Sequence, residues 1–294
     1  MTNLTVNNTQ GGSDCKPSER IERIPRIIHY CWVGRNPLIP LAKKCIASWK
    51  KFCPDYKIIE WNEDNFDINY CAYTREAYNA KKWAFVADVM RLYALVNYGG
   101  IYMDTDVEVI KPLDDLLKFH AVSGFETEKY IPTGLMACEK GHPAFVEFLK
   151  EYDGIHFIRF DRTPNMTTNV KRITDKSLKY GLVQDNSEQT LSNGFHILPT
   201  DYLCPKDWRT GAINITSNTY TIHHFAGTWL KTDEGDYYDK MYNKISSMLH
   251  ISGSFPKRIA IAMTLFKFYG TFTVFCRTCR FIGKKLGFIK EKEL

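Results

Sequence analysis

The stretch that decides the fold reads Tyr98-Gly99-Gly100-Ile101-Tyr102-Met103-Asp104-Thr105-Asp106-Val107-Glu108-Val109-Ile110. It predicts the end of a helix, a glycine turn, and then a strand that carries two carboxylates. Residues i and i+2 of a strand point to the same face, so Asp104 and Asp106 are expected side by side, roughly 6–7 Å apart. Two carboxylates held on a strand suit a hard divalent cation such as Mg²⁺ or Mn²⁺. Such a cation would in turn suit the diphosphate of a nucleotide-linked substrate.

A helix is predicted immediately before this strand, over residues 81–98. Its apolar residues form two adjoining stripes, and a wide apolar surface of this kind indicates a buried helix. Asp88 and Arg91 are embedded in that surface, three residues apart and therefore on one face. Because an unpaired charge is costly to bury, the two side chains either pair with each other or line a cleft.

Three ordered motifs resemble a known family. They are Ile-Pro-Arg-Ile-Ile-His-Tyr-Cys-Trp-Val-Gly at 24–34, Ala-Asp-Val-Met-Arg at 87–91, and Gly-Gly-Ile-Tyr-Met-Asp-Thr-Asp at 99–106. With this spacing the chain resembles glycosyltransferase family 32 over about residues 24–230. Members of this family are DXD-motif sugar transferases, among them the yeast initiating α-1,6-mannosyltransferase and bacterial capsule and O-antigen enzymes. The same ordered motifs occur in the large clostridial glucosylating toxins.

The resemblance implies an α/β fold of the GT-A type. This fold is a Rossmann-like mixed sheet flanked by helices, with the DXD motif at a strand end near the switch point. The alternation of predicted helices and strands along the chain also supports the α/β class. Besides the two elements above, the sequence predicts strands over 24–33 and 57–61 and helices over 40–52, 140–153 and 239–249.

The resemblance also assigns residues to a nucleotide-sugar donor, linked to UDP or GDP. Trp32 matches the aromatic residue that stacks on the base, and Asp88 and Arg91 match the pair that contacts the ribose and the sugar. The full set assigned to the donor is Trp32, Val33, Asp88, Arg91, Tyr102, Asp104 and Trp229. The catalytic set is Asp104, Asp106, Asp88 and Arg91.

A second segment, residues 220–229, is expected to complete a Mn²⁺ or Mg²⁺ site. Its alternation predicts a strand that runs into a glycine turn. In this superfamily such a segment supplies the last metal ligand and a Trp that closes over the diphosphate. Counting back from Trp229 places His224 as that ligand, beside Asp104 and Asp106, and His223 on the opposite face.

The chain divides into three expected parts: a loose polar tail over residues 1–23, a transferase domain over 24–250 and a basic helical tail over 251–294. Residues 255–294 contain nine Lys or Arg and two Glu, a net charge of +7, so the rest of the chain carries −1 of the total of +6. The apolar run in this tail is interrupted at Lys267 and Gly270 and falls short of a membrane span. Residues 255–290 suit an interfacial helix on an anionic membrane surface. Packing on the domain or on a dimer partner is the main alternative, and binding to nucleic acid is not expected.

The function expected from these features is a retaining, metal-dependent glycosyltransferase. It would move a hexose or N-acetylhexosamine from a nucleotide sugar to a growing glycan, and the expected glycan is a lipid-linked polysaccharide. An effector that glycosylates a protein and a non-catalytic nucleotide-sugar-binding module are the alternatives. No secretion signal opens the sequence, and nine cysteines without a pattern fit a reducing compartment. The expected location is therefore the cytoplasm, peripheral on the inner face of the cell membrane.

Overall fold

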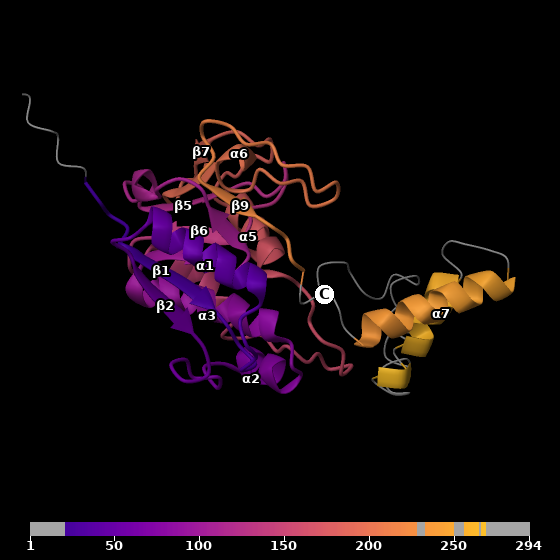
Figure 1. Ribbon diagram of the computed structural model, residues 1–294. Helices are drawn as coiled ribbons and strands as arrows, with labels where there is room; N and C mark the ends of the chain where they lie inside the picture. The colour runs from indigo at the N-terminus through magenta and orange to yellow at the C-terminus, as the bar shows by residue number, and fades with distance from the viewer. Residues whose placement is uncertain (1–20, 228–232, 250–255, 265, 269–294) are drawn as a thin grey trace, which may run out of the picture.

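The computed structural model describes residues 21–227, 233–249, 256–264 and 266–268. Its centre is a seven-stranded sheet in the order β2-β1-β3-β6-β5-β8-β7, with helices on both faces (Figure 1). The strands of this sheet are β1 (Ile27–Cys31), β2 (Lys57–Trp61), β3 (Gly100–Met103), β5 (Ala121–Gly124), β6 (Leu135–Cys138), β7 (Gln189–Thr190) and β8 (Phe195–Leu198). The predicted α/β class is confirmed, and the mixed sheet is consistent with a GT-A-like arrangement.

The sheet is mixed, but most of its strands run in the same direction and end at one edge. β1 runs parallel to β2 and to β3, and β5 runs parallel to β8. β6 lies between β3 and β5 and is antiparallel to both. The carboxyl ends of β1, β3, β5 and β8 therefore all lie at the same edge of the sheet.

Each face of the sheet has its own hydrophobic core. One core contains residues of α2 (Ala72–Asn79), α3 (Trp83–Tyr98) and α4 (Pro143–Lys150) together with Tyr102. The other contains residues of α1 (Pro40–Phe52) together with Ile101 and Met103. Successive residues of β3 thus alternate between the two cores, as the pleat of a strand requires.

The remaining helices occur between and after the later strands of the sheet. They are η1 (Asp114–Leu116), α5 (Asn169–Leu178), α6 (Thr200–Leu203) and α7 (Asp233–Leu249). The predicted helices over 81–98, 40–52, 140–153 and 239–249 correspond to α3, α1, α4 and α7, with ends that differ by up to six residues. Figure 1 shows α7 outside the body formed by the sheet and its helices.

The turn from α3 into β3 requires glycine at two successive positions. Gly99 has φ 67° and Gly100 has φ 105°, a region that other residues rarely adopt. A Cβ on Gly99 would lie 2.7 Å from the backbone nitrogen of Lys140, and one on Gly100 would lie 2.6 Å from the carbonyl oxygen of Ile27. The predicted glycine turn is therefore confirmed, and it lets α3 and β3 pack closely.

His29, in the middle of β1, is buried and secures this turn. Its Nε2 lies 2.8 Å from the carbonyl oxygen of Gly99, and the indole N–H of Trp61 donates to its Nδ1 at 3.0 Å. The ring is therefore neutral, with its proton on Nε2, where it donates to Gly99. Burial lowers the pKa of His29 to about 4.

One strand was predicted through residue 110, and the structure divides it into two. β3 ends at Met103, and β4 (Val107–Val109) pairs with β9 (Thr221–His223) in a separate two-stranded ribbon. The division arises at a turn, where the backbone N–H of Val107 donates to the carbonyl of Asp104 at 3.0 Å. Val107 and Val109 are nevertheless buried in the same core as Met103.

Within the described part of the chain, no helix combines the length and the apolar character that crossing a membrane requires. Most of the predicted membrane-binding tail, and residues 1–20 of the predicted polar tail, lie outside the described residues. The described pieces of the tail, 256–264 and 266–268, are helical. The boundaries of the three predicted parts and the membrane surface stay predictions.

Candidate functional site

The site is built at the edge of the sheet where its five parallel strands, β2 included, end. Asp104 follows β3 directly, and its backbone N–H donates to the carbonyl of Gly134 at 2.8 Å. Asp106 lies two residues on, in the turn before β4. The two carboxylates are thus presented by a strand end and a turn rather than by a continuous strand.

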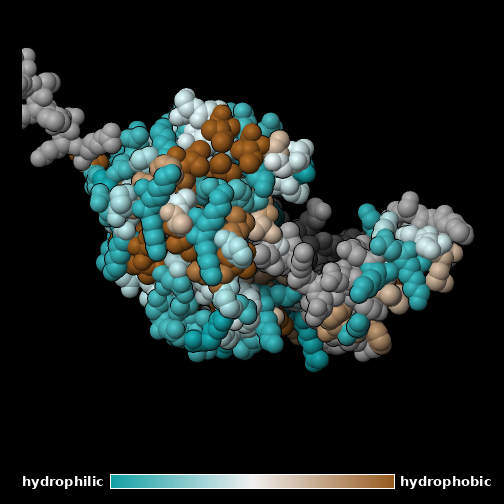
Figure 2. Space-filling view, viewed as in Figure 1, coloured by the Kyte–Doolittle hydropathy of each residue, from teal (hydrophilic) through white to brown (hydrophobic). Residues whose placement is uncertain are grey.

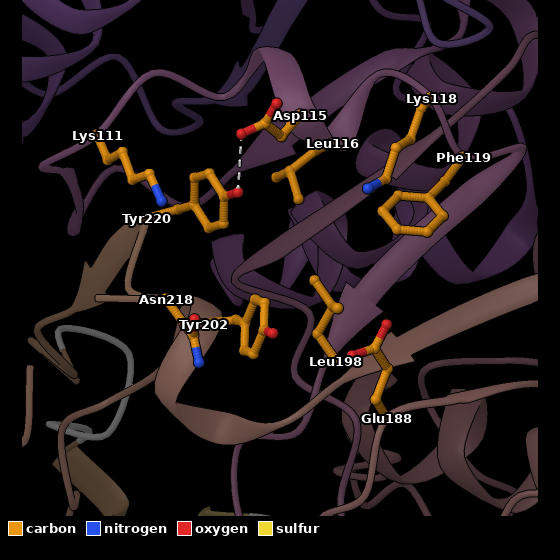
Figure 3. Close-up of a pocket in the computed structure, with 10 residues that line it drawn as sticks. All are labelled: Lys111, Asp115, Leu116, Lys118, Phe119, Glu188, Leu198, Tyr202, Asn218 and Tyr220. Atoms are coloured by element: carbon orange, nitrogen blue, oxygen red, sulfur yellow. Dashed lines mark hydrogen bonds between the residues drawn. The ribbon is translucent and has the colours of Figure 1, made fainter. Parts of the chain in front are cut away.

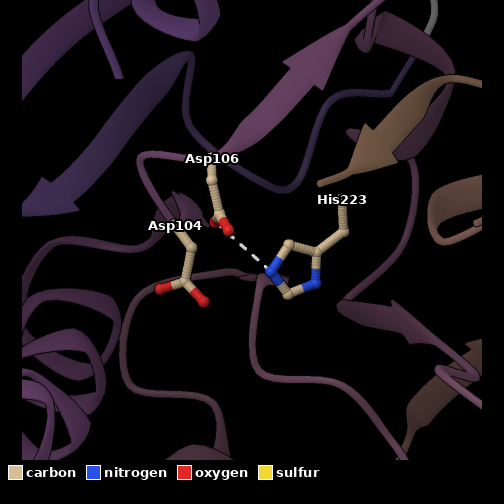
Figure 4. A group of neighbouring side chains, drawn as sticks. All are labelled: Asp104, Asp106 and His223. Carbon is tan, nitrogen blue, oxygen red and sulfur yellow. Dashed lines mark ion pairs between the residues drawn. The ribbon is translucent and has the colours of Figure 1, made fainter. Parts of the chain in front are cut away.

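Asp104, Asp106 and His223 form a cluster of candidate metal ligands (Figure 4). One ligand atom from each of the three lies within 4.8 Å of the other two. The Nε2 of His223 is 3.3 Å from Oδ1 of Asp106. Figure 4 shows the imidazole reaching the carboxylates from a different segment of the chain, the end of β9.

His223 occupies the position that the sequence prediction gave to His224. His224 points to the other side of the ribbon, where its Nε2 lies 2.8 Å from Oε2 of Glu108. The alternation had been predicted correctly, but the face had been assigned by counting back from Trp229, which lies outside the described residues. The sequence of β9 carries no signal for the choice, because its alternation does not say which of the two faces meets the carboxylates.

The charges of Asp106 and His223 stabilise each other. Burial acts to raise the pKa of Asp106, but the hydrogen bond and charge of His223 outweigh it and leave that pKa below its ordinary value. Burial acts to lower the pKa of His223, but Asp106 and the neighbouring Cys204 thiol raise it well above its ordinary value. The backbone N–H of Ala226 also donates to Oδ2 of Asp106 at 2.8 Å.

Gly134 leaves the space that the His223 ring fills. A Cβ at this position would lie 2.9 Å from both Cε1 and Nδ1 of the imidazole, closer than real Cβ contacts. The same glycine accepts the hydrogen bond from the backbone of Asp104. One small residue therefore supports two members of the cluster.

Asp88 and Arg91 pair with each other, which is one of the two alternatives that the sequence left open. The Nη2 of Arg91 is 3.4 Å from a carboxylate oxygen of Asp88 and 3.4 Å from one of Asp104. Its Nη1 donates to the carbonyl of Thr133 at 2.9 Å. The pair therefore also reaches the first carboxylate of the DXD motif.

Tyr102 joins the same network from β3. Its hydroxyl donates to Oδ1 of Asp104 at 2.8 Å, and the guanidinium of Arg91 lies 4.7 Å from the centre of its ring. Burial raises the pKa of Asp88 to about 6, against the opposing effect of Arg91. Burial acts to lower the pKa of Arg91, but Asp104, Tyr102 and Asp88 together raise it above its ordinary value. A buried, permanently charged guanidinium beside the Asp104 carboxylate is suited to binding an anionic ligand.

Trp32 and Val33 follow the carboxyl end of β1, which pairs in parallel with β3. Both side chains are half-buried. The indole N–H of Trp32 donates to the carbonyl of Asn36 at 2.5 Å. The two residues therefore lie at the same sheet edge as Asp104. Trp229, also assigned to the donor from the sequence, lies outside the described residues.

Glu126 is a site residue that the sequence analysis missed. It follows the carboxyl end of β5 at the same edge, and its carboxylate has no hydrogen-bond or ion-pair partner among the described residues. Burial raises the pKa of Glu126. The charge of His223 acts to lower it, and that of Asp104 acts to raise it further. Because it lies two residues beyond β5, the rule that ligands bind at the carboxyl ends of parallel strands could have drawn attention to it.

The three clustered side chains fit a hard divalent cation. They offer two carboxylate oxygens and one imidazole nitrogen, a donor set that suits Mn²⁺ or Mg²⁺ better than a soft metal. Cys204 beside His223 is a thiol whose pKa burial raises, which disfavours the thiolate that a soft metal would require. The residues present therefore agree with the metal that the DXD motif implies.

A model of the glycosyltransferase sugar-binding region containing the DXD motif matches residues 41–122. This range contains Asp88, Arg91 and the two DXD carboxylates, and it ends before His223. The match therefore covers the part of the site contributed by α3 and β3. The ribbon strand β9 joins that part from outside the matched range.

Named relatives are sugar transferases. The chain is 29% identical over 147 residues to inositol phosphoceramide mannosyltransferase 3 of Schizosaccharomyces pombe, an alignment that covers 45% of this chain and 38% of that protein. It is 24% identical over 180 residues to human lactosylceramide 4-alpha-galactosyltransferase, covering 56% of this chain and 47% of that protein. The chain thus spans less than half the length of either relative.

Among solved structures, a chain described as PaToxG glycosyltransferase is similar over 54% of this chain and 69% of its own length. Its TM-score is 0.43 and its sequence identity is 19%.

Proposed function

We propose that this chain, which contains the DXD sugar-binding region of glycosyltransferase family 32, transfers a hexose or N-acetylhexosamine from a nucleotide sugar to a glycan. The observation that carries the proposal is the convergence of Asp104, Asp106 and His223 within 4.8 Å, with Arg91 beside Asp104. Pure binding of a sugar requires no such metal set. A cation held there would stabilise the negative charge that develops on a departing nucleoside diphosphate.

Asp104, Asp106 and His223 would hold a divalent cation, Mn²⁺ or Mg²⁺. When bound, such a cation supplies positive charge that stabilises the departing diphosphate. The other residues of the site position the donor. Arg91 would donate hydrogen bonds to the negatively charged part of the donor. Trp32 offers a face on which a base can stack, an interaction favourable by about 1–3 kcal/mol in nucleic-acid complexes.

Asp88 holds Arg91 in place, and its own position is fixed from the backbone. The side-chain amide of Asn169 donates to the carbonyl of Asp88 at 3.1 Å, which ties α5 to α3. Because the charged and polar partners are set by packed helices and strands, little reorganisation is needed when a donor binds.

We propose a lipid-linked acceptor in polysaccharide or oligosaccharide synthesis. The names of the two relatives above both specify a ceramide, which supports a lipid acceptor. Retention of configuration, by front-face attack, is proposed from the resemblance alone. The anomeric configuration of the product, read by NMR, would distinguish retention from inversion.

The basic tail is proposed to hold the protein at an anionic membrane surface on the cytoplasmic side. The charge of +7 over residues 255–294 supports this. Sedimentation of the protein with vesicles that contain anionic lipid, at low and high salt, tests it. Binding that is equal to that on neutral vesicles would contradict it.

The first experiment incubates the purified protein with Mn²⁺ and a panel of UDP- and GDP-sugars, and measures release of nucleotide with and without EDTA. Metal-dependent release from one donor supports the proposal and identifies the sugar. Asp106→Asn should lower turnover at least ~100-fold, since it removes a ligand of the cation that would stabilise charge in the transition state. The matched control is Asp55→Asn, the same change at an exposed position, which should keep normal turnover. Equal activity in the two variants would refute the assignment.

A further inference from the structure

A cavity lies on the face of the sheet that carries α1, away from the metal-ligand cluster. Its volume is about 370 Å³, which falls within the range of small-molecule sites in proteins. Its lining comes from the segment after β4, the residue before β7, the end of β8, α6 and the segment before β9. Figure 3 shows side chains from these separate segments pointing into one shared space.

The lining combines an apolar floor with aromatic walls. Leu116 and Leu198 are buried, and Tyr220 is only 8% exposed. The rings of Tyr202 and Tyr220 are stacked at 27°, with their centres 6.4 Å apart. The floor and walls therefore present apolar surface to an occupant, and polar groups stand beside it: the Tyr220 hydroxyl donates to Oδ2 of Asp115 at 3.2 Å (Figure 3).

The charged groups of the cavity balance one another. Lys111 and Lys118 supply two positive charges, and Asp115 and Glu188 supply two negative ones. Each lysine also lies near an aromatic ring, 4.4 Å from that of Tyr220 for Lys111 and 5.1 Å from a neighbouring phenylalanine ring for Lys118. A cavity without net charge is poorly suited to a phosphate or a nucleotide.

Both hydrogen-bond donors and acceptors surround this space. Lysine ammonium and Asn218 amide groups donate, whereas carboxylates accept, and tyrosine hydroxyls do both. A sugar ring has hydroxyl groups that need both kinds of partner, and C–H faces that pack on aromatic rings. The chemistry therefore fits a neutral carbohydrate.

The cavity and the metal-ligand cluster are joined by two short segments. β9 begins one residue after Tyr220 and ends at His223, a separation of ~10 Å along an extended chain. α6 contains Tyr202, and Cys204, beside His223, follows its end directly. A glycan held in the cavity would thus be anchored one short strand away from the transfer centre.

We propose that this cavity is a carbohydrate-binding subsite for neutral sugar units of the acceptor glycan, distinct from the donor site. The identification of the glycan as the acceptor rests on the proposed function. Binding itself requires neither donor nor metal. The subsite proposal and the proposed function can therefore be refuted independently of each other.

The test applies the full chain, without donor or metal, to an array of immobilised neutral and acidic oligosaccharides, and confirms each hit by saturation-transfer NMR. Tyr202→Ala should weaken binding to a neutral oligosaccharide at least about tenfold, as expected on removing a central aromatic contact. Lys118→Ala, at an exposed position that carries no risk to folding, should weaken it to a smaller degree. Tyr70→Ala is the matched control: it makes the same change at a tyrosine that is 38% exposed and does not line the cavity.

Asp106→Asn separates this proposal from the proposed function, because it should abolish donor turnover and leave glycan binding unchanged. If the protein binds glycan but releases nucleotide from no donor, the subsite proposal stands and the transferase proposal is refuted. The subsite is refuted if no neutral oligosaccharide binds, if Tyr202→Ala and Lys118→Ala bind as the wild type does, or if binding is confined to acidic glycans and disappears at high salt.

Discussion

Replacing the two adjacent histidines one at a time tests the geometry of the candidate site most directly. His223 lies with Asp104 and Asp106, whereas His224 lies on the other side of the ribbon beside Glu108. His223→Ala removes one of three candidate metal ligands. His224→Ala makes the same chemical change at the next position of the chain, so the two variants control for each other.

The structure sets different magnitudes for the two variants. Loss of a group that stabilises charge in the transition state costs a factor of about 10²–10³ in turnover, and we expect at least ~100-fold for His223→Ala. His224 is 19% exposed and its partner Glu108 also binds Lys44 at 2.9 Å. Removing His224 should therefore cost no more than about 1 kcal/mol of stability and leave kcat/KM nearly unchanged.

The assay is release of nucleotide from the donor identified in the panel, at saturating Mn²⁺, with thermal unfolding of each variant measured in parallel. Calorimetric titration with Mn²⁺ should show weaker binding for His223→Ala alone. A larger loss of activity in His224→Ala than in His223→Ala, with both variants folded, would refute the assignment and restore His224 as the ligand.

Three further predictions follow from single contacts. Gly134→Ala places a Cβ 2.9 Å from the His223 ring, so the ring must shift. The affinity for Mn²⁺, measured by calorimetry, should therefore fall about 10–100-fold, the usual loss when residues that position a metal ligand are changed. An unchanged affinity would contradict this prediction. Glu126→Gln should lower kcat about tenfold or more at unchanged Mn²⁺ affinity, because its carboxylate lies just beyond β5, near enough to His223 and Asp104 to interact with their charges; wild-type kcat would exclude a substrate contact. His29 is neutral when folded, and burial lowers its pKa to about 4 from the ordinary 6.5. Its stabilising contribution is complete above pH 6.5 and is lost as the pH falls toward 4. In urea unfolding between pH ~7.5 and ~5, the wild type should therefore lose about 2 kcal/mol more than His29→Gln does. Asp88, whose pKa burial raises to about 6, titrates with the opposite sign, but it is present in both proteins and cancels from that comparison.

Local patterns determined much of the fold. The apolar stripes around Asp88 and Arg91 predicted α3, and Pro40 and the spacing that follows it predicted α1. The paired glycines predicted the turn into β3. These features depend on propensity and periodicity within short segments, so the sequence alone carries them. The three spaced motifs also indicated the family and the DXD carboxylates.

Tertiary structure decided which distant groups meet. The strand predicted through Val109 divides at Asp104, because pairing with β9 draws the second half into a separate ribbon. That pairing, between residues more than a hundred positions apart, also chooses His223 over His224. A strand has two faces, and its sequence alternates between them without saying which one meets the carboxylates.

The sequence by itself determined the α/β class, the helices beside the sheet and four of the charged residues of the site: Asp88, Arg91, Asp104 and Asp106. Only the tertiary structure placed His223 and Glu126 beside them and assembled the cavity on the α1 face from five separate segments. The physical reason is the range of the interactions. Helices, turns and strand periodicity arise from neighbours along the chain, whereas a ligand cluster depends on strand order and register, which are set by packing of the whole domain.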